Sequence, residues 1–227
     1  MPTGIFTNTW VETSAKILFR GATAPDPTKF RVCLANTATL GRSSSIADFV
    51  AAELLPINGY SRVSGSFSGD GSYDATDQRY ENIIAAAFSA SGGALQFQTV
   101  FLIANSTAIS SRSFSNTDVN ATSDTITINS HGFANGDKLV FTPDALATLP
   151  GGINTGTIYT VASATTNTFQ IGVDITNTGS GTFRARSANG IVVAYAVESS
   201  PITVPDGQGY SYQFPLVVLN TGYVGGI

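Results

Sequence analysis

Few side chains of this chain could do acid–base or nucleophilic chemistry. A catalytic triad would place the single histidine, His131, beside the single cysteine, Cys33, or a serine, with an acid such as Asp137 to orient the ring. Serines are so numerous that one near His131 is expected by chance. We interpret His131 as part of a turn, with Phe133 filling a small core, and Cys33 as a small buried hydrophobe in a strand. The sequence therefore predicts no catalytic residue and no enzyme.

A local run of carboxylates is the second place where chemistry is conceivable. Oxygen ligands this close could bind Ca²⁺, but their spacing is not that of an EF-hand loop. Two carboxylates could also flank a glycosidic bond, although the long β-helical repeats usual in phage depolymerases are not evident. We interpret the run as a solvated loop and expect no metal and no cofactor. Its members are Asp70, Asp74, Asp77 and Glu81.

Composition and charge exclude several classes of partner. The 227 residues are 42% hydrophobic and 11% charged, with a formal net charge of −4. The Lys and Arg residues are scattered singly, so no basic stripe offers itself to nucleic acid. No apolar run is long enough to cross a membrane, and residues 1–9 lack the features of a secretory signal. We expect assembly in the cytoplasm, without nucleic-acid or membrane partners.

One short helix is predicted near the N-terminus, over residues 11–20. Thr9 and Glu12 have the spacing of a capping box. Gly21 is a stop signal, and two prolines follow it. One face of this helix carries three apolar side chains at helical spacing, Val11, Ala15 and Leu18.

The rest of the chain is a series of short strands separated by turn residues. Strands are predicted at 30–34, 60–67, 95–103, 190–197 and 210–219. Residues 81–88 fit a helix or a strand, and we favour a strand. Residues 46–55 fit a short helix with Ser45 as its cap and Pro56 at its end.

Between residues 110 and 186 the chain becomes richer in Thr, Asn and Gly. Five short strands are predicted there, at 125–128, 138–141, 158–161, 168–171 and 181–184, which suggests a small barrel or sandwich. The predicted fold is therefore mostly β. A discontinuous β-sandwich domain, residues 1–109 and 187–227, has one short N-terminal helix and carries an inserted small β-barrel or sandwich module, residues 110–186.

Several aromatic side chains could serve either the core or a contact between subunits. Tyrosine is favoured at interfaces, and alternate aromatic residues also pack routinely inside a sheet. The candidate interface residues are Trp10, Tyr210, Tyr212 and Tyr223. The N-terminal arm, residues 2–8, and the C-terminal tail are candidates for strand addition to a neighbour. A homo-oligomer is expected, with a trimer as one option.

Several segments of the outer domain together resemble a family of small virion proteins of tailed bacteriophages, described as tail-fibre-like or decoration-like. The N-terminal helix ends in Leu18-Phe19-Arg20-Gly21, and the strand Phe30-Arg31-Val32-Cys33-Leu34 follows. Glu53 and then Gly59-Tyr60-Ser61-Arg62-Val63 match the family's G-Y-A-R pattern. The final strands match as well, from Gly190 through Pro201 and Val204, then from Tyr212 to Leu219.

The inserted stretch is similar to a second module of phage tail and fibre proteins. It begins His131-Gly132-Phe133, continues through Asn135-Gly136-Asp137, and ends in Asn167-Thr168-Phe169-Gln170. The resemblance implies a virion structural protein, most simply a capsid decoration or cement protein that contacts the major capsid protein or other virion subunits. The alternative that it implies is a tail, neck or fibre component whose inserted module binds a host glycan.

Overall fold

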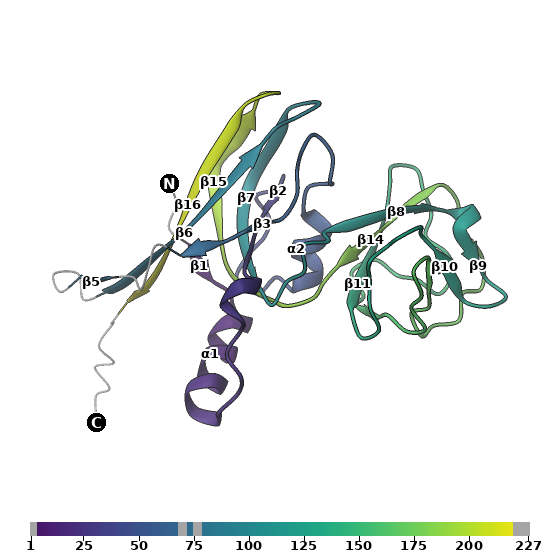
Figure 1. Ribbon diagram of the computed structural model, residues 1–227, viewed down its shortest axis with the longest axis horizontal. Coiled ribbons are helices and arrows are strands. Elements are labelled where there is room, and N and C mark those ends of the chain that lie inside the picture. The colour runs from purple at the N-terminus through teal and green to yellow at the C-terminus, as the bar shows by residue number, and fades with distance from the viewer. Residues whose placement is uncertain (1–3, 68–71, 75–78, 220–227) are drawn as a thin grey trace.

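Two antiparallel β-sheets pack face to face, and two smaller sheets lie to one side of them (Figure 1). The computed structural model describes residues 4–67, 72–74 and 79–219. The predicted mostly-β class is confirmed, and no sheet within these residues closes into a barrel. Neither described helix has the length and hydropathy of a membrane-spanning segment.

The first sheet has the strand order β1-β15-β7-β2-β3. The second has the order β16-β6-β4, with β5 also paired to β6. Pairing with β16 along its whole length makes the segment around 81–88 a strand, as we favoured. The bounds in the first sheet are β1 (Ile5–Phe6), β15 (Ile191–Val204), β7 (Leu95–Ala104), β2 (Arg31–Ala35) and β3 (Val63–Ser64). Those in the second are β16 (Gly209–Leu219), β6 (Arg79–Ser89), β4 (Ser66–Phe67) and β5 (Ser72–Asp74).

The single strand predicted over 60–67 is wrong, because the chain changes sheets at Gly65. β3 pairs with β2 in the first sheet, whereas β4 pairs with β6 in the second. A Cβ atom on Gly65 would lie 2.8 Å from the Ile84 side chain, so a glycine lets the backbone pass that close.

The main core lies between these two sheets. Phe97 and Leu102 enter it from the first sheet, and Ile84, Phe88 and Tyr212 enter it from the second. β7 is apolar on both faces, because Phe101 and Ile103 point the other way and are also fully buried. A strand without polar–apolar alternation needs a second cover.

The helix α2 (Ile46–Ala52) provides that cover. Ser45 and Asp48 form a capping box at its start, as Ser45 predicted, but the helix ends at Ala52, before the predicted residue 55. The Phe49 ring lies 5.1 Å from that of Phe101. Sheet, sheet and helix thus form three layers, with a second core beneath α2.

The inserted segment forms two sheets of its own, around a third core. All five short strands predicted there are present, and β8 and β9 are additional. The four-stranded sheet has the order β12 (Tyr159–Thr160), β11 (Lys138–Pro143), β14 (Thr182–Ser187) and β8 (Ser111–Ser115). The three-stranded sheet has the order β13 (Thr168–Phe169), β10 (Thr125–Thr127) and β9 (Val119–Asn120), and the short helix η2 (Asn116–Asp118) precedes β9.

The chain enters and leaves this module at neighbouring positions. β8 and β14 pair side by side, and the Ser187 N–H donates to the Ser110 carbonyl at 3.0 Å. The third core draws its residues from within 109–185. The domain division at residues 110 and 186 stays a prediction.

The helix α1 (Asn8–Arg20) follows β1 and projects away from both sheets (Figure 1). The capping box predicted at Thr9 and Glu12 is wrong, because the N-cap is Thr7, whose hydroxyl accepts from the Trp10 N–H. Gly21 ends the helix as predicted, with a left-handed φ of 66°. The short helix η1 (Pro27–Lys29) then leads into β2.

Candidate functional site

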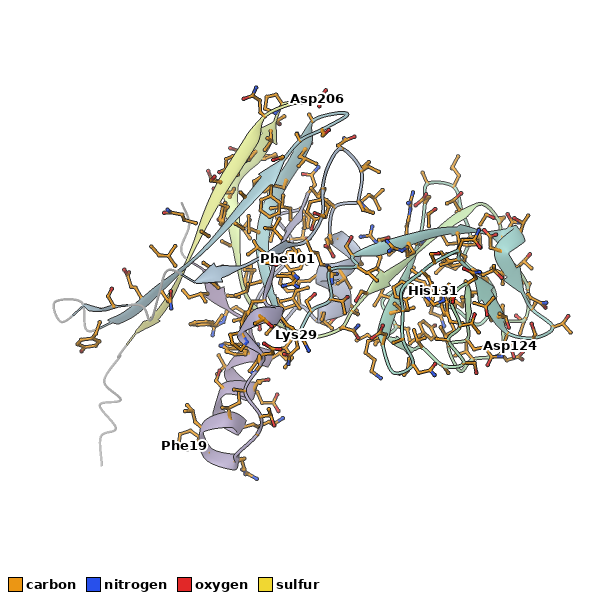
Figure 2. The ribbon with its side chains drawn as sticks, in the orientation of Figure 1. Phe19, Lys29, Phe101, Asp124, His131 and Asp206 are labelled. Atoms are coloured by element: carbon orange, nitrogen blue, oxygen red, sulfur yellow. The ribbon has the colours of Figure 1, made fainter. Side chains whose placement is uncertain are left out.

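His131 is a core residue of the inserted module. It is fully buried, and its Nδ1 accepts from the Phe133 N–H at 2.9 Å, while its Nε2 lies 3.3 Å from the Thr168 carbonyl. Its ring lies 5.4 Å from Phe133 and 5.1 Å from Phe169 (Figure 2). The imidazole thus shapes the turn and fills the core beside Phe133, as we interpreted it.

Cys33 is likewise a buried structural residue. Burial raises the pKa of its thiol, and the nearby Glu53 carboxylate adds to the rise. The thiolate is the reactive form of cysteine, so this thiol is a poor nucleophile in the folded chain.

We expect Cys33 to resist thiol reagents until the protein unfolds. Native protein should incorporate less than about a tenth of the label that unfolded protein takes up in the same time. Mass spectrometry after timed treatment with iodoacetamide, with and without guanidinium, measures this. Rapid labelling of the native chain would show that β2 is open to solvent.

The acidic run lies largely outside the described part of the chain. Asp70 and Asp77 fall in undescribed segments, and the side chain of Asp74 is not described either. Glu81 lies in β6 and has interactions within the chain. Within residues 4–67, 72–74 and 79–219, no three His, Cys, Asp or Glu residues come together as a metal site. The solvated-loop interpretation is wrong for Asp74 and Glu81, whose backbones lie in the paired strands β5 and β6, and it stays a prediction for Asp70 and Asp77.

Residues of the G-Y-A-R-like segment form a buried ion-pair network with Glu53. Arg62 Nη2 donates to Glu53 Oε2 at 2.6 Å, and both side chains are essentially without solvent contact. The same guanidinium donates to the Ser106 hydroxyl and to the Ser187 carbonyl. The Tyr60 hydroxyl donates to Glu53 Oε1 at 2.8 Å. Burial by itself lowers the pKa of Arg62, but the Glu53 carboxylate more than reverses this, so Arg62 is a fixed cation.

A second arginine attaches the inserted module to α2. Arg186 of β14 donates from Nη1 to the carbonyls of Val50 and Glu53, at 3.0 and 2.8 Å. These carbonyls lie at the C-terminal end of α2, where backbone acceptors lack helical partners. With the Arg62 to Ser187 hydrogen bond, this contact fixes the module on the body. The network is a structural junction, because its charged and polar groups form hydrogen bonds with one another.

The structure places the predicted interface residues mostly in or near the main core. Tyr212 is fully buried between the two sheets, and its hydroxyl donates to Glu198. Tyr210 is half-buried beside it, with its ring 5.5 Å from Phe97. Trp10 is half-buried against the same core at the base of α1. Tyr223 lies outside the described residues. Tyr212 is thus a core residue, and the interface roles of Trp10, Tyr210 and Tyr223 stay predictions.

The N-terminal arm is paired within its own chain. Ile5 and Phe6 form β1, which pairs with Tyr195 and Ala194 of β15. β1 is the edge strand of the first sheet, so this pairing uses one of its two edges, and strand addition to a neighbour stays a prediction. Residues 2–3 and 220–227, which complete the arm and the tail, lie outside the described residues.

The base of α1 is firmly attached to the body. The Thr7 hydroxyl, which caps the helix, also donates to the Val192 carbonyl, and the Thr7 N–H donates to the Val193 carbonyl at 3.0 Å. After the helix, the Asp26 N–H donates to Asn105 Oδ1 at 3.0 Å. The helix is thus held at its base and on its return to the body.

Beyond this base, one face of α1 has no cover. None of its 13 residues is buried. Leu18 is 75% exposed, Phe19 is 82% exposed and Val11 is 51% exposed, and Figure 2 shows Phe19 at the free end of the helix. An isolated helix of about this length is only marginally stable in water. An apolar face left open on such a helix is typical of a contact surface.

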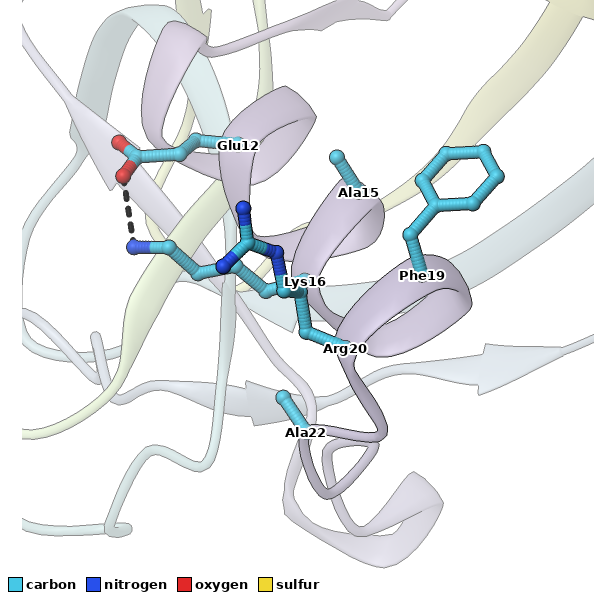
Figure 3. Close-up of a pocket in the computed structure, with 6 residues that line it drawn as sticks. All are labelled: Glu12, Ala15, Lys16, Phe19, Arg20 and Ala22. Atoms are coloured by element: carbon cyan, nitrogen blue, oxygen red, sulfur yellow. Dashed lines mark hydrogen bonds and ion pairs between the residues drawn. The ribbon is translucent and has the colours of Figure 1, made fainter.

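A shallow groove lies beside this face, lined by Ala15 and Phe19 of the helix and by its neighbours Glu12, Lys16, Arg20 and Ala22, and not by Val11 or Leu18 (Figure 3). It has a volume of about 650 Å³. Ala15 forms its floor, and Phe19 stands on one side. On the other side Glu12 pairs with Lys16 at 2.6 Å. We define the docking face as the exposed apolar residues Val11, Ala15, Leu18 and Phe19 of α1.

The sequence contained part of this surface but did not identify its role. Val11, Ala15 and Leu18 were predicted on one helical face, and the structure leaves that face open to solvent. Phe19 was not singled out as a contact residue. The position of Phe19 beside Leu18, just before the helix stop at Gly21, is the sequence signal that could have indicated a contact residue.

Comparisons with models of known protein families and with curated protein sequences give no match for this chain.

Proposed function

We propose that this protein is a non-enzymatic structural subunit of a tailed-phage particle, a decoration or cement protein that stabilises the capsid shell by subunit contacts. The observation that carries the proposal is the docking face of α1. A helix that is anchored at its base and open along its apolar face needs a partner to bury that face. The resemblance of the outer domain to small virion proteins supports the same role.

The rest of the molecule suits a subunit that works by contact. A rigid body holds α1 in place, since the Thr7 anchor ties it to β15, a strand that lies between the main core and the core beneath α2. His131 and Cys33 have the most reactive side chains of the described residues, and both are fully buried and pack in a core. A preorganised surface loses little conformational entropy on binding.

Purified particles provide the direct test. If the protein is a decoration subunit, mass spectrometry of the particles finds it in many copies spread over the shell. Particles made without it should release their contents at a temperature several degrees lower, as followed by a DNA-binding dye. Absence from mature particles, or unchanged heat resistance without the protein, would overturn the proposal.

A second candidate function is a tail, neck or fibre component that binds a host glycan through the inserted module. The observation that favours it is the position of residues 110–186, which have their own core and lie well to the side of the body (Figure 1). A small copy number at one vertex would favour this function over decoration. A glycan array probed with the full chain tests binding. The absence of binding to any polysaccharide of the host would exclude this second function.

A further inference from the structure

We propose that the outer edge of β16 pairs with the same edge of a second copy of this chain, as two antiparallel strands related by a two-fold axis at Ser211. The inference goes beyond the proposed function and does not depend on it. Three features carry it: the length of this edge, the direction of its backbone groups and the side chains beside them.

β16 is the longest strand at the edge of a sheet in the described residues (Figure 1). It has 11 residues, whereas every other edge strand there has two to five. None of the residues 209–219 is charged. Soluble proteins usually protect a sheet edge with short strands, charged side chains or proline, because an open edge is a template for pairing with another chain. A long edge without charge is therefore suited to strand addition.

The ladder with β6 fixes which backbone groups of β16 point outward. The Gln208 carbonyl accepts from the Ala90 N–H at 2.9 Å, and the pairing continues residue by residue from there. Positions bonded to the partner strand alternate with positions that are not bonded to it. Gly209, Ser211 and Gln213 therefore turn their N–H and carbonyl groups away from β6.

The available stretch of this edge ends after Gln213. Pro215 has no N–H to offer, and Gly4 forms a parallel bridge with Leu216. No strand of the described residues pairs with the outer side of residues 209–213. We define the free edge as the outer side of residues 209–213.

The next-longest edge strand, β8, shows how the molecule protects an edge elsewhere. The Ser115 N–H donates to Asp118 Oδ2 at 2.7 Å, and Arg112 Nη1 donates to the Ser111 carbonyl at 3.4 Å. Local side chains thus take up part of the outer backbone groups of β8. Among the described residues, no side chain does the same for the free edge of β16.

The free edge fits its own reverse. With the two-fold axis at Ser211, Ser211 lies opposite Ser211 of the second copy, and Gly209 lies opposite Gln213. Each outward N–H then meets an outward carbonyl, as in any antiparallel ladder. The exposed side chains that become neighbours are small or uncharged, so no like charges are brought together. A second copy is therefore a complementary occupant of this edge.

The inner face of the pair covers Tyr210. This side chain is half-buried in the single chain, with its ring 5.5 Å from Phe97. In the register centred on Ser211, Tyr210 lies opposite Tyr212 of the second copy, on the face that points toward the main core. Directly opposed aromatic residues on one face of a sheet stabilise the pairing. The pair thus gives Tyr210 the interface role that the sequence predicts for it.

A parallel pair of the same two edges lacks this fit. It requires an axis along the strands, which turns the inner face of one copy to the outer side of the other. Tyr210 would then lie beside the exposed face of β16 and gain no aromatic neighbour. The antiparallel pair keeps both inner faces on one side and closes as a dimer.

Sedimentation equilibrium of the full chain, from about 1 to about 200 μM, tests the pair. The unaltered chain should pass from monomer to dimer over this range. Ser211→Pro removes the N–H at the axis and should weaken dimerisation more than about 30-fold. The fold should tolerate this proline, because position 211 does not donate to β6 and Pro215 already lies at an equivalent position of the ladder. Ser211→Ala is the matched control. It keeps the N–H and should dimerise like the unaltered chain.

Charges placed at the axis test the register. Ser211→Lys alone and Ser211→Glu alone each set like charges opposite each other, and each should weaken dimerisation roughly 3-fold. An equal mixture of the two variants forms a heterodimer in which opposite charges face each other. The mixture should therefore dimerise more tightly than either variant alone. Circular dichroism checks that each variant keeps its secondary structure.

The possible results separate the pair from its alternatives. A chain that stays monomeric over the whole concentration range, or a Ser211→Pro variant that dimerises like the unaltered chain, overturns the pair. A mixture no tighter than the separate variants overturns the register centred on Ser211. A monomeric chain found in many copies on particles would reject this inference and keep the proposed function, whereas a dimer absent from particles would do the reverse.

Discussion

Replacing Arg62 with methionine lowers the free energy of unfolding by about 3–5 kcal/mol. The substitution leaves the Glu53 carboxylate in an apolar site with its cation removed. In the native chain that carboxylate receives three hydrogen bonds from Arg62 and one from Tyr60. A buried charge without a partner is much more costly than the pair is stabilising. Urea unfolding followed by tryptophan fluorescence measures the loss.

Two further variants test whether the loss of stability comes from the buried Glu53 carboxylate or from the removal of any cation. Lys16→Met removes the cation of an exposed ion pair and should cost less than about 1 kcal/mol. Glu53→Gln combined with Arg62→Met removes both charges, while a side-chain amide can still accept from Tyr60. The double variant should therefore be more stable than Arg62→Met alone. A loss below about 1 kcal/mol for Arg62→Met would mean that water reaches the pair.

Phe169→Ala should open the inserted module and leave the body folded. Phe169 is fully buried and lies against His131 and Phe133, so its truncation removes the centre of the third core. Phenylalanine-to-alanine changes in a core cost about 3–5 kcal/mol. Hydrogen exchange should show lost protection within 110–186, with protection of β7 and β15 retained.

Phe97→Ala is the matched substitution in the main core. It removes the same side chain from an equally buried site between the two sheets, and it should expose β7 and β15 to exchange. If Phe169→Ala opened the body as well, the two cores would unfold as one unit. That result would contradict the division into residues 1–109 with 187–227 and residues 110–186.

Much of the fold was predictable because local signals and tertiary structure agree. The short strands of the module are bounded by turn residues, and Gly136 and Gly152 adopt the positive φ that such turns require. The strand β8 was missed because Ser111–Ser115 contains one apolar residue, Phe114, so no alternation shows. Its place in the sheet is decided by pairing with β14, which lies far away in the sequence.

The candidate surface was less predictable, because it depends on what surrounds each residue. Thr7 and Thr9 are equally good caps by sequence, and the contact of Thr7 with Val192 selects it. An apolar helical face has the same sequence pattern whether a core or a partner covers it. Tyr212 illustrates the reverse case, since an interface aromatic and a core aromatic share one pattern, and here the first sheet covers it.

The neighbouring entry and exit points of the inserted module have a consequence for how such proteins diversify. Ser110 and Ser187 are hydrogen-bonded to each other. A different module could therefore be inserted between these two positions without a change in the path of the surrounding chain. The new module would need a hydrogen-bond donor in place of Arg186, since the carbonyls of Val50 and Glu53 would otherwise lose their partner. Recombination could thus exchange the module while the scaffold and its exposed helix stay the same.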